Sequence, residues 1–245
     1  MADRSAKIRL FVTGDLGPGG AVAVDRNQGH YLINVMRATA GTRIACFNGR
    51  DGEWLCEIAE ASRKNVVLKA LEQTRPQGLP PDLRLLFAPI KKARTDFIVE
   101  KATEMGVRAI QPVFTRYTNS ERIRPDKLRA HCIEAAEQCG GIFVPDLHEA
   151  VKLDQALAAM PADRALVFCD ERMVAETGLK ALEPLAGKPA AILVGPEGGF
   201  SEEEAERIRS LPNCVSVTLG PRILRADTAA VAALALWQAA CGDWR

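Results

Sequence analysis

Hydrophobic and polar positions follow two different patterns along the chain, and the first predicts a small β domain. In the N-terminal part, short apolar or alternating runs surround one helical pattern. The predicted strands cover residues 7–12, 42–47, 53–58 and 65–71, and the predicted helix covers residues 27–37. Asn48-Gly49 and Asp51-Gly52 lie between the second and third strands and predict a hairpin there.

From residue 83 onward, short apolar runs of strand length alternate with helical patterns. The predicted strands cover residues 83–89, 109–114, 165–169, 190–194 and 215–219. The predicted helices cover residues 91–105, 125–139, 154–160, 173–185 and 228–241. This alternation is typical of an α/β fold with a mainly parallel sheet and helices on both of its faces.

A proline-rich segment separates the two patterns. Residues 75–82 read RPQGLPPD, and their three prolines and one glycine continue neither a helix nor a strand. We therefore expect a β domain in residues 1–74, a linker in residues 75–82 and an α/β domain in residues 83–245.

The composition is that of an ordinary globular protein, with 47% hydrophobic and 26% charged residues among 245. Residues 1–7 are followed by no apolar segment, and the longest apolar run, 229–237, is too short to cross a bilayer, so we expect no signal peptide and no membrane span. Seven cysteines without a CxxC pair predict reduced thiols and a cytoplasmic location. The three histidines, His30, His131 and His148, are far apart, which predicts no metal site.

Charge is distributed unevenly along the chain although the net charge is only +1. Residues 1–130 contain 22 Lys and Arg against 14 Asp and Glu, whereas residues 131–245 contain 10 against 17. This asymmetry predicts that the N-terminal half faces a polyanion such as RNA. A chance imbalance of solvated surfaces is the alternative.

The stretch 190–225 contains two strand-and-loop units in succession. The strand 190–194 runs into Gly195-Pro196-Glu197-Gly198-Gly199, and the strand 215–219 runs into Gly220-Pro221-Arg222. Ser201 and Glu204 between them have the spacing of a capping box at a helix start. Because open α/β sheets bind ligands at the carboxyl ends of their strands, the two loops predict one shared site.

The ligand predicted for these loops is neutral or cationic rather than a phosphate. Neither the GxxxxGK[ST] nor the GxGxxG spacing occurs here. Four carboxylates, those of Glu197, Glu202, Glu203 and Glu204, lie at the same helix start and would repel an anion. An adenosine that carries a sulfonium fits better. Two tight turns without any ligand are the alternative reading.

At these residues the chain resembles a known family. LVGPEGGFSEEE followed by LGPRILRADTAAVAALA is similar to the paired signature of the RsmE-type 16S rRNA (uracil-N3)-methyltransferases of the SPOUT superfamily. The resemblance covers nearly the whole chain. It implies an N-terminal PUA-like β-barrel domain and a C-terminal SPOUT domain that binds S-adenosylmethionine in a trefoil knot. It also implies a homodimer that packs through the SPOUT domain, with 16S rRNA or the 30S subunit as substrate.

The resemblance implies cofactor contacts, mostly through backbone groups, in and around the two loops. The expected cofactor-binding residues are Leu193, Gly195, Pro196, Glu197, Gly198, Gly199, Leu219, Gly220, Ile223, Leu224, Thr228 and Ala229. Methylation at N3 of uracil creates negative charge on the ring, so a cation must stabilise it. We expect Arg225 in that role, with Arg222 as second choice, and Glu197 or Asp227 as general base.

Basic residues in both predicted domains are candidate RNA contacts. They are Arg9, Arg37, Arg50, Lys91, Lys92, Arg94, Arg116 and Arg222. The three cations of 91–94 oppose the dipole of the helix that they begin, and RNA phosphate would compensate them. For each of these residues an ordinary solvated side chain is the alternative.

The chain departs from the family pattern at two places. Gly141 stands where the family usually continues with arginine, and Ala226-Asp227 stands where Thr-Glu is common. Two alternatives to a 16S rRNA (uracil-N3)-methyltransferase stay open, and the departures at Gly141 and Ala226 support only the first of them. One is a non-catalytic RNA-binding scaffold, and the other is a SPOUT methyltransferase that acts on another RNA, such as tRNA.

Overall fold

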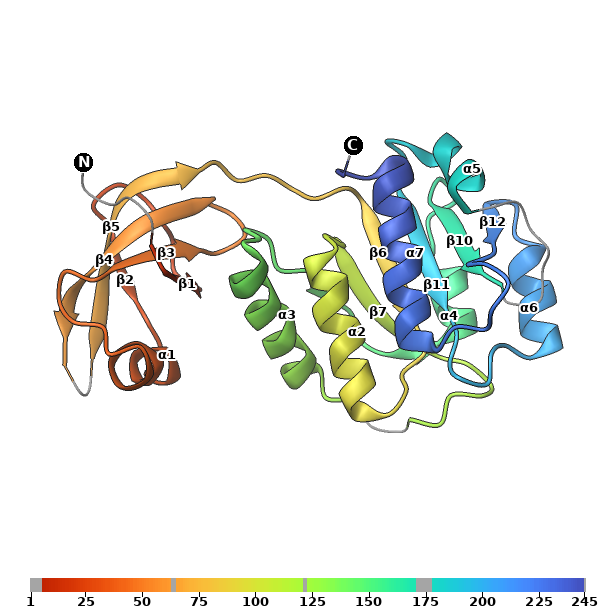
Figure 1. Cartoon of the computed structure of the whole chain (residues 1–245), viewed down its shortest axis with the longest axis horizontal. Helices are drawn as coiled ribbons and strands as arrows, with labels where there is room; N and C mark the ends of the chain where they lie inside the picture. The colour runs from red at the N-terminus through yellow and green to blue at the C-terminus, as the bar shows by residue number, and fades with distance from the viewer. Residues whose placement is uncertain (1–5, 63–64, 121–122, 171–177, 245) are drawn as a thin grey trace. The chain divides into compact units, whose positions relative to one another are not determined.

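The chain forms two compact units in a computed structural model that describes residues 6–62, 65–120, 123–170 and 178–244 (Figure 1). The first unit comprises Met1–Leu79 together with Ala136–Val144. The second unit comprises Pro80–Ala135 and Pro145–Arg245. A short segment from the middle of the chain therefore belongs to the N-terminal unit, which no sequence pattern indicated.

In its described residues, the first unit contains a five-stranded sheet with the order β1-β3-β4-β5-β2. Its strands are β1 (Ile8–Phe11), β2 (Ala21–Ala23), β3 (Arg43–Phe47), β4 (Glu53–Ala61) and β5 (Val66–Arg75). β1 and β3 are parallel, and the other neighbours are antiparallel, so the hairpin predicted between β3 and β4 is confirmed. β2 was not predicted because it has three residues, of which only Val22 is buried.

One helical segment accompanies this sheet, as predicted. α1 (Arg26–His30) begins at a capping box formed by Asp25 and Gln28, and it continues as a π-helical turn, η1 (Tyr31–Val35). Leu32 is fully buried and anchors the segment in a core made by the alternating residues of the strands.

The second unit contains a seven-stranded sheet in the part of the chain that the structure describes. The order is β12-β10-β11-β6-β7-β8, β9 pairs with β7, and every pairing is parallel. The strands are β6 (Leu83–Phe87), β7 (Ala109–Phe114), β8 (Asp146–Leu147), β9 (Val151–Lys152), β10 (Ala165–Cys169), β11 (Ala190–Val194) and β12 (Cys214–Val217). The predicted parallel sheet is thus confirmed, and only the two-residue strands β8 and β9 were missed.

Helices cover both faces of this sheet (Figure 1). They are α2 (Lys92–Glu104), α3 (Pro125–Cys139), α4 (Leu153–Ala158), α5 (Gly178–Leu182) with the 3-10 turn η2 (Glu183–Leu185), α6 (Glu202–Arg209) and α7 (Ala226–Cys241). Residues of α4 and α6 share one apolar core with β10 and β11, whereas α2 and α7 pack on each other. The predicted helix 173–185 is confirmed from Gly178 onward, and its residues 173–177 lie outside the described residues.

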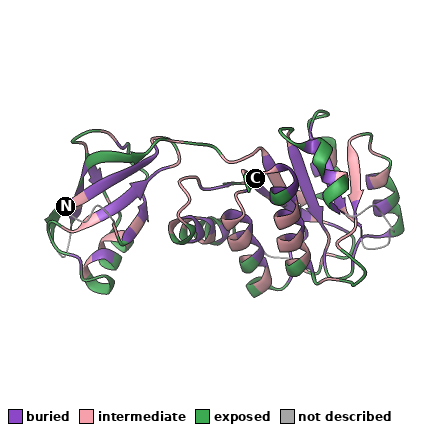
Figure 2. Cartoon of the chain, turned by 45° about the horizontal axis from the view of Figure 1, so that its top comes forward, coloured by how far each residue is buried: buried purple, intermediate pink, exposed green. Residues whose placement is uncertain are grey.

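The inner strands β6, β7, β10 and β11 of the parallel sheet are buried along most of their length, as Figure 2 shows in purple. β11 is buried at all five positions, which explains why its sequence is a continuous apolar run. Within the described ranges, no helix has the length and apolar content needed to cross a membrane. The predicted α/β fold with an added β domain is confirmed, and the trefoil knot stays a prediction.

Candidate functional site

A cavity of about 490 Å³ opens at the carboxyl ends of three adjacent strands of the second unit, β11, β10 and β12. The loop 195–199 after β11 and the loop 218–224 after β12 form two of its walls. The end of β10 lies between them because β10 is the middle strand of the three. Both glycine loops therefore face one cavity, at the edge of the sheet where parallel strands present their ligands.

Most of the cofactor-binding residues expected from the sequence line this cavity. Those that line it are Gly195, Pro196, Glu197, Gly199, Leu219, Gly220, Ile223, Leu224 and Ala229. Three others do not. Leu193 is buried in the core of the sheet, Gly198 is exposed beside Tyr117, and Thr228 is exposed on α7. Their roles stay predictions.

Sequence reasoning missed the contribution of β10 and of several residues beside the loops. The missed lining residues are Phe168, Cys169, Asp170, Val194, Phe200, Ala205, Val217, Thr218, Pro221 and Ala226. Strand order was the missing information. The run ALVFC followed by Asp170 reads as an ordinary buried strand until β10 is known to lie between the two loop-bearing strands.

The first loop is shaped by a close contact between Gly195 and Phe200. A Cβ atom on Gly195 would lie 2.6 Å from the Phe200 ring, so a side chain there would displace the ring. That ring packs edge-on against Phe168, with centroids 5.2 Å apart. Gly199 has φ +67° and donates its N–H to the Pro196 carbonyl at 2.9 Å. Glycine is therefore required at both positions for local geometric reasons.

The predicted capping box at the start of α6 is confirmed. The Ser201 hydroxyl accepts from the Glu204 N–H at 3.2 Å, and the Glu204 carboxylate accepts from the Ser201 N–H at 2.9 Å. The same carboxylate also accepts from the N–H of Arg116, in the loop after β7, at 2.8 Å. Glu204 thus binds two loops at this edge of the sheet, and one of the four carboxylates is used for structure.

Two side chains at the end of β10, Asp170 and Cys169, give this part of the cavity its polar and apolar character. Asp170 is almost fully buried and accepts from the Arg209 Nε at 2.7 Å. This hydrogen bond raises the pKa of Arg209 above its ordinary value, so the guanidinium stays charged. Burial raises the pKa of the Cys169 thiol to about 12, so this cysteine is a protonated apolar wall and not a nucleophile.

The candidate catalytic residues lie at the rim of the cavity. Arg225 is exposed and forms the N-cap of α7, next to the lining residue Ala226. The two candidate bases share one partner. Arg94 Nη1 lies 2.5 Å from Glu197 Oε1, and Arg94 Nε lies 3.7 Å from Asp227 Oδ2. The structure thus brings Glu197 and Asp227 to one guanidinium.

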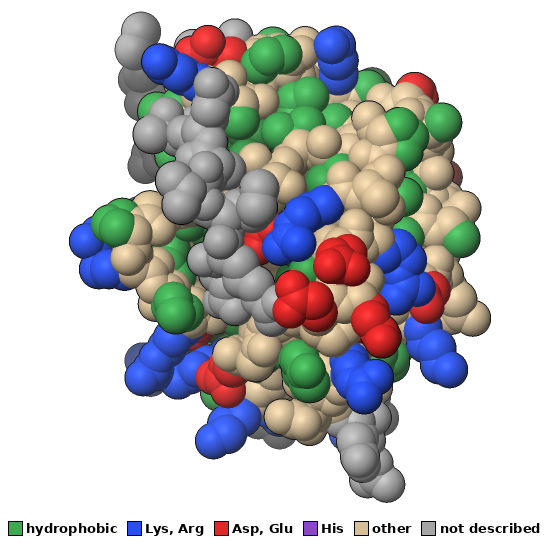
Figure 3. Space-filling view, turned by 90° about the vertical axis from the view of Figure 1, so that its right-hand side faces the viewer, with side chains coloured by type: hydrophobic (Ala, Val, Ile, Leu, Met, Phe, Trp, Pro, Cys, Tyr) green, Lys and Arg blue, Asp and Glu red, His purple; other side chains and the backbone are tan. Residues whose placement is uncertain are grey.

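The RNA candidates of the second unit differ in their surroundings. Arg222 is exposed and lines the cavity, and Arg116 is exposed on the loop after β7. Lys91 is exposed at the N-cap of α2, while Lys92 pairs with Asp96 at 2.9 Å on the same helix. On the end of this unit that carries α6, acidic and basic side chains lie interspersed (Figure 3). That surface shows no block of one sign.

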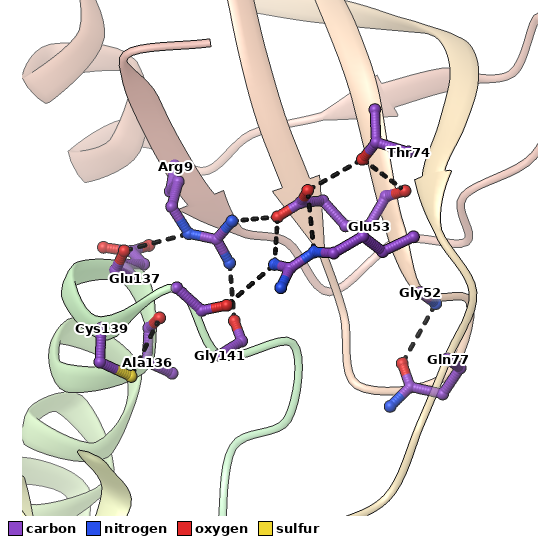
Figure 4. Close-up of polar contacts among 11 residues, drawn as sticks. Arg9, Gly52, Glu53, Thr74, Gln77, Ala136, Glu137, Cys139 and Gly141 are labelled. Atoms are coloured by element: carbon purple, nitrogen blue, oxygen red, sulfur yellow. Dashed lines mark hydrogen bonds and ion pairs between the residues drawn. The ribbon is translucent and has the colours of Figure 1, made fainter. Parts of the chain in front are cut away.

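Among the RNA candidates of the first unit, Arg9 is engaged inside the protein (Figure 4). Its Nη1 donates to the Glu53 carboxylate, and its Nε and Nη2 donate to the carbonyls of Glu137 and Gly141 at 3.1 and 2.7 Å. Arg50 is exposed and pairs with Asp15 at 2.8 Å. Arg37 is exposed with φ +53°, the one positive φ of a non-glycine residue in the described part of the chain.

The cavity walls suit an adenosine with a positive charge better than a phosphate. The loops offer backbone groups at Gly199, Leu219 and Gly220 beside apolar side chains. Asp170 and Glu197 are the acidic lining residues, and Arg222 is the basic lining residue. Among the described residues, no cluster of three or more His, Cys, Asp or Glu side chains could hold a metal ion.

Comparison with known proteins agrees with this geometry. Residues 77–238 match the RNA methyltransferase domain family, and residues 24–71 match the RNA methyltransferase PUA domain family. The chain is 31% identical over 229 residues to ribosomal RNA small subunit methyltransferase E of Rickettsia conorii, covering 93% of each protein. It is 29% identical over 220 residues to the Bacillus subtilis protein of the same name, covering 84% of each.

Two similar solved structures contain S-adenosylmethionine. A Legionella pneumophila methyltransferase in complex with this cofactor is 28% identical, with a TM-score of 0.88 over 96% of this chain and 98% of that one. Ribosomal RNA small subunit methyltransferase E of Neisseria gonorrhoeae, also bound to it, is 27% identical, with a TM-score of 0.86 over 97% and 99%. The chain therefore belongs to the ribosomal RNA small subunit methyltransferase E family of RNA methyltransferases.

Proposed function

We propose that the protein transfers the methyl group of S-adenosylmethionine to N3 of a uridine in the 16S rRNA of the small ribosomal subunit. The observation that carries this proposal is the cavity at the ends of β11, β10 and β12, built by both glycine loops. Relatives that span the chain carry the name of a small-subunit rRNA methyltransferase, and two similar structures hold the cofactor. The uridine N3 target comes from the resemblance of the two loop signatures.

The cavity has the size and chemistry for this cofactor. Its volume of about 490 Å³ lies in the usual range for nucleotide-sized ligands. The backbone edges of Gly199 and Gly220 approach it without side chains, and Phe168, Val217 and Leu219 give it apolar walls. Glu197 lines the cavity and would accept hydrogen bonds from ribose hydroxyls. When bound, S-adenosylmethionine supplies an electrophilic methyl group beside a positive sulfonium.

The residues at the rim of the cavity would carry out the chemistry on the uracil base. Loss of the N3 proton spreads negative charge over O2 and O4, and the Arg225 guanidinium would stabilise it. Glu197 or Asp227 would receive the proton. Asp227 is one methylene shorter than the glutamate that is common in the family, and this shortens its reach. Ala226 replaces a threonine hydroxyl by an apolar wall.

We also propose a homodimer and a cytoplasmic location. α7 is rich in alanine, and its small side chains permit close approach of a second helix. None of the seven cysteines forms a disulfide within the described residues, which fits a reducing compartment.

The test of the function is transfer of labelled methyl groups from S-adenosylmethionine to 30S subunits, naked 16S rRNA and tRNA, followed by nucleoside analysis. We expect 3-methyluridine in small-subunit rRNA. A different methylated nucleoside, or methylated tRNA, would show that the protein is a methyltransferase with another substrate. RNA binding without any cofactor binding would support the non-catalytic scaffold instead.

The substitution Arg225→Ala tests the catalytic assignment. We expect the rate of methyl transfer to fall about 100-fold, because one charge-stabilising donor is lost from the transition state. The affinity for S-adenosylmethionine should stay within a factor of about two. Arg129→Ala, which removes an exposed arginine on α3, is the matched control. Equal rates for both variants would remove Arg225 from the mechanism.

A further inference from the structure

Arg94, in the first turn of α2, forms its ion pairs with residues outside its own helix. This turn has no acidic residue, and its N-cap, Lys91, makes no side-chain capping hydrogen bond. Lys92 finds its partner on the same helix, four residues on, at Asp96. Arg94 instead pairs with Glu197, which is 103 positions away in the chain. The excess charge of this turn is thus partly compensated within the protein.

Arg94 joins two elements that contribute lining residues to the cavity. Glu197 belongs to the loop after β11 and lines the cavity, and its Oε1 lies 2.5 Å from Arg94 Nη1. Asp227 lies in the first turn of α7, between the lining residues Ala226 and Ala229, and its Oδ2 lies 3.7 Å from Arg94 Nε. The Arg94 side chain is 30% exposed, so it lies at the rim rather than in the core.

Each of the two walls is closed by hydrogen bonds of its own. The glycine loop is closed by the bond from Gly199 to Pro196, and the start of α7 by the bond from Ala229 to Arg225 at 2.7 Å. The Arg94 guanidinium reaches from one wall to the other. A planar fork can contact two carboxylates through separate edges, whereas a lysine ammonium is a single point charge at the end of a flexible chain.

From this geometry we propose that Arg94 is a positioning residue of the cofactor site and not an RNA contact. It holds the glycine loop and the start of α7 at the separation that the cofactor requires. It also fixes the orientations of Glu197 and Asp227 and keeps Arg225, the N-cap of α7, at the rim. The inference rests on the proposed function, because it concerns the cavity that binds S-adenosylmethionine.

The experiment measures binding to the full chain by calorimetry, with S-adenosylmethionine and S-adenosylhomocysteine as probes. These ligands share the adenosine and the amino acid, but only the first carries the sulfonium charge. We expect Arg94→Lys and Arg94→Ala to weaken both ligands by about tenfold. Lys101→Ala removes a cation that pairs with Glu104 within the same helix, and it should change neither affinity.

The two ligands and the two substitutions distinguish three roles of Arg94: positioning the cavity walls, acting only through its charge, and contacting RNA. A purely electrostatic role would give full recovery with Arg94→Lys and different effects on the charged and uncharged ligands, which would overturn the proposal. An RNA contact would leave both ligand affinities unchanged and would weaken binding of 16S rRNA, with a lower dependence on salt. That result would overturn it too.

A double-mutant cycle, made with variants whose circular dichroism matches that of the wild type, tests whether Arg94 and Glu197 act through one contact. Glu197→Gln and Arg94→Lys, made singly and together, should lose less ligand affinity jointly than the sum of their single losses, because they act through one contact. Additive losses would contradict the proposal. If the wild-type protein binds neither ligand, the proposed function fails, and this inference fails with it. Binding by the wild type with unchanged affinity in both Arg94 variants would overturn the inference alone.

Discussion

Two networks of arginine and carboxylate groups, one in each unit, have opposite compositions. In the Glu53 network (Arg9, Glu53, Thr74, Arg75), one carboxylate accepts from two guanidinium groups and a hydroxyl (Figure 4). In the Arg94 network (Arg94, Glu197, Asp227), one guanidinium faces two carboxylates. The Glu53 side chain is 10% exposed, whereas that of Glu197 is 49% exposed.

This difference in burial decides what each network can do. A buried carboxylate cannot recover its hydration when a partner is removed, so the Glu53 network should contribute strongly to stability. Exposed ion pairs contribute little to stability, so the Arg94 network matters through the positions that it fixes. Further hydrogen bonds from the two arginines of the Glu53 network to backbone carbonyls support its structural role. Arg9 and Arg75 also donate to the carbonyls of Gly141 and Gly140.

The largest effect on stability is expected from Glu53→Ala. This substitution leaves Arg9 and Arg75 without their shared carboxylate in a part-buried site, and the free energy of unfolding should fall by about 3 kcal/mol. Chemical denaturation followed by circular dichroism measures it. Glu72→Ala, on the exposed side of β5, is the control and should change stability by less than about 0.5 kcal/mol. Similar losses in the two variants would contradict the distinction between the networks.

A smaller loss is expected from Arg9→Ala. Arg9 makes three hydrogen bonds and lies over the Phe47 ring at 5.2 Å, but Arg75 remains to compensate Glu53. We expect the free energy of unfolding to fall by about 2 kcal/mol, because the hydrogen bonds to charged groups are lost.

The same variant tests the assignment of Arg9 as an RNA contact. Its affinity for 16S rRNA should be measured at a temperature where the protein stays folded. Unchanged affinity would place Arg9 with the structural arginines. Weaker binding of 16S rRNA with unchanged stability would show that Arg9 contacts the RNA. The Glu53 network would then not be purely structural, and its contrast with the Arg94 network would fail.

The fold could be predicted from the sequence wherever a local pattern determines structure. β7, β10 and β11 were predicted with their observed bounds because strands buried on both faces are short apolar runs. The capping box at Ser201 was predicted because its two residues lie three positions apart. These features depend on near neighbours alone.

The parts that could not be predicted depend on contacts between distant residues. The lining by Asp170 requires the strand order β12-β10-β11, which no run of residues reveals. The pairing of Arg94 with Glu197 joins positions 103 apart, so 91–94 read as an uncompensated basic turn. The internal engagement of Arg9 likewise depends on Glu137 and Gly141, from a segment more than 120 positions away.

The smallest effect is a dependence of stability on pH that arises in the Glu53 network. Burial raises the pKa of Glu53, but hydrogen bonds from Arg75, Thr74 and Arg9 outweigh it and lower the pKa from its ordinary value of 4.5. A carboxyl group with a lower pKa in the folded state stabilises the protein above its unfolded pKa. This stability is lost as the pH falls through the folded pKa.

Unfolding should therefore be measured from neutral pH down to about pH 3 in the wild type and in Glu53→Gln. The wild type should lose stability steeply below about pH 4.5, and the variant should lose less because it has no proton to bind at this position. A residual slope is expected in both, because a hydrogen bond from the Leu16 N–H and another from Asn48 also lower the pKa of Asp51. Parallel curves for the two proteins would show that Glu53 titrates alike in the folded and unfolded chains.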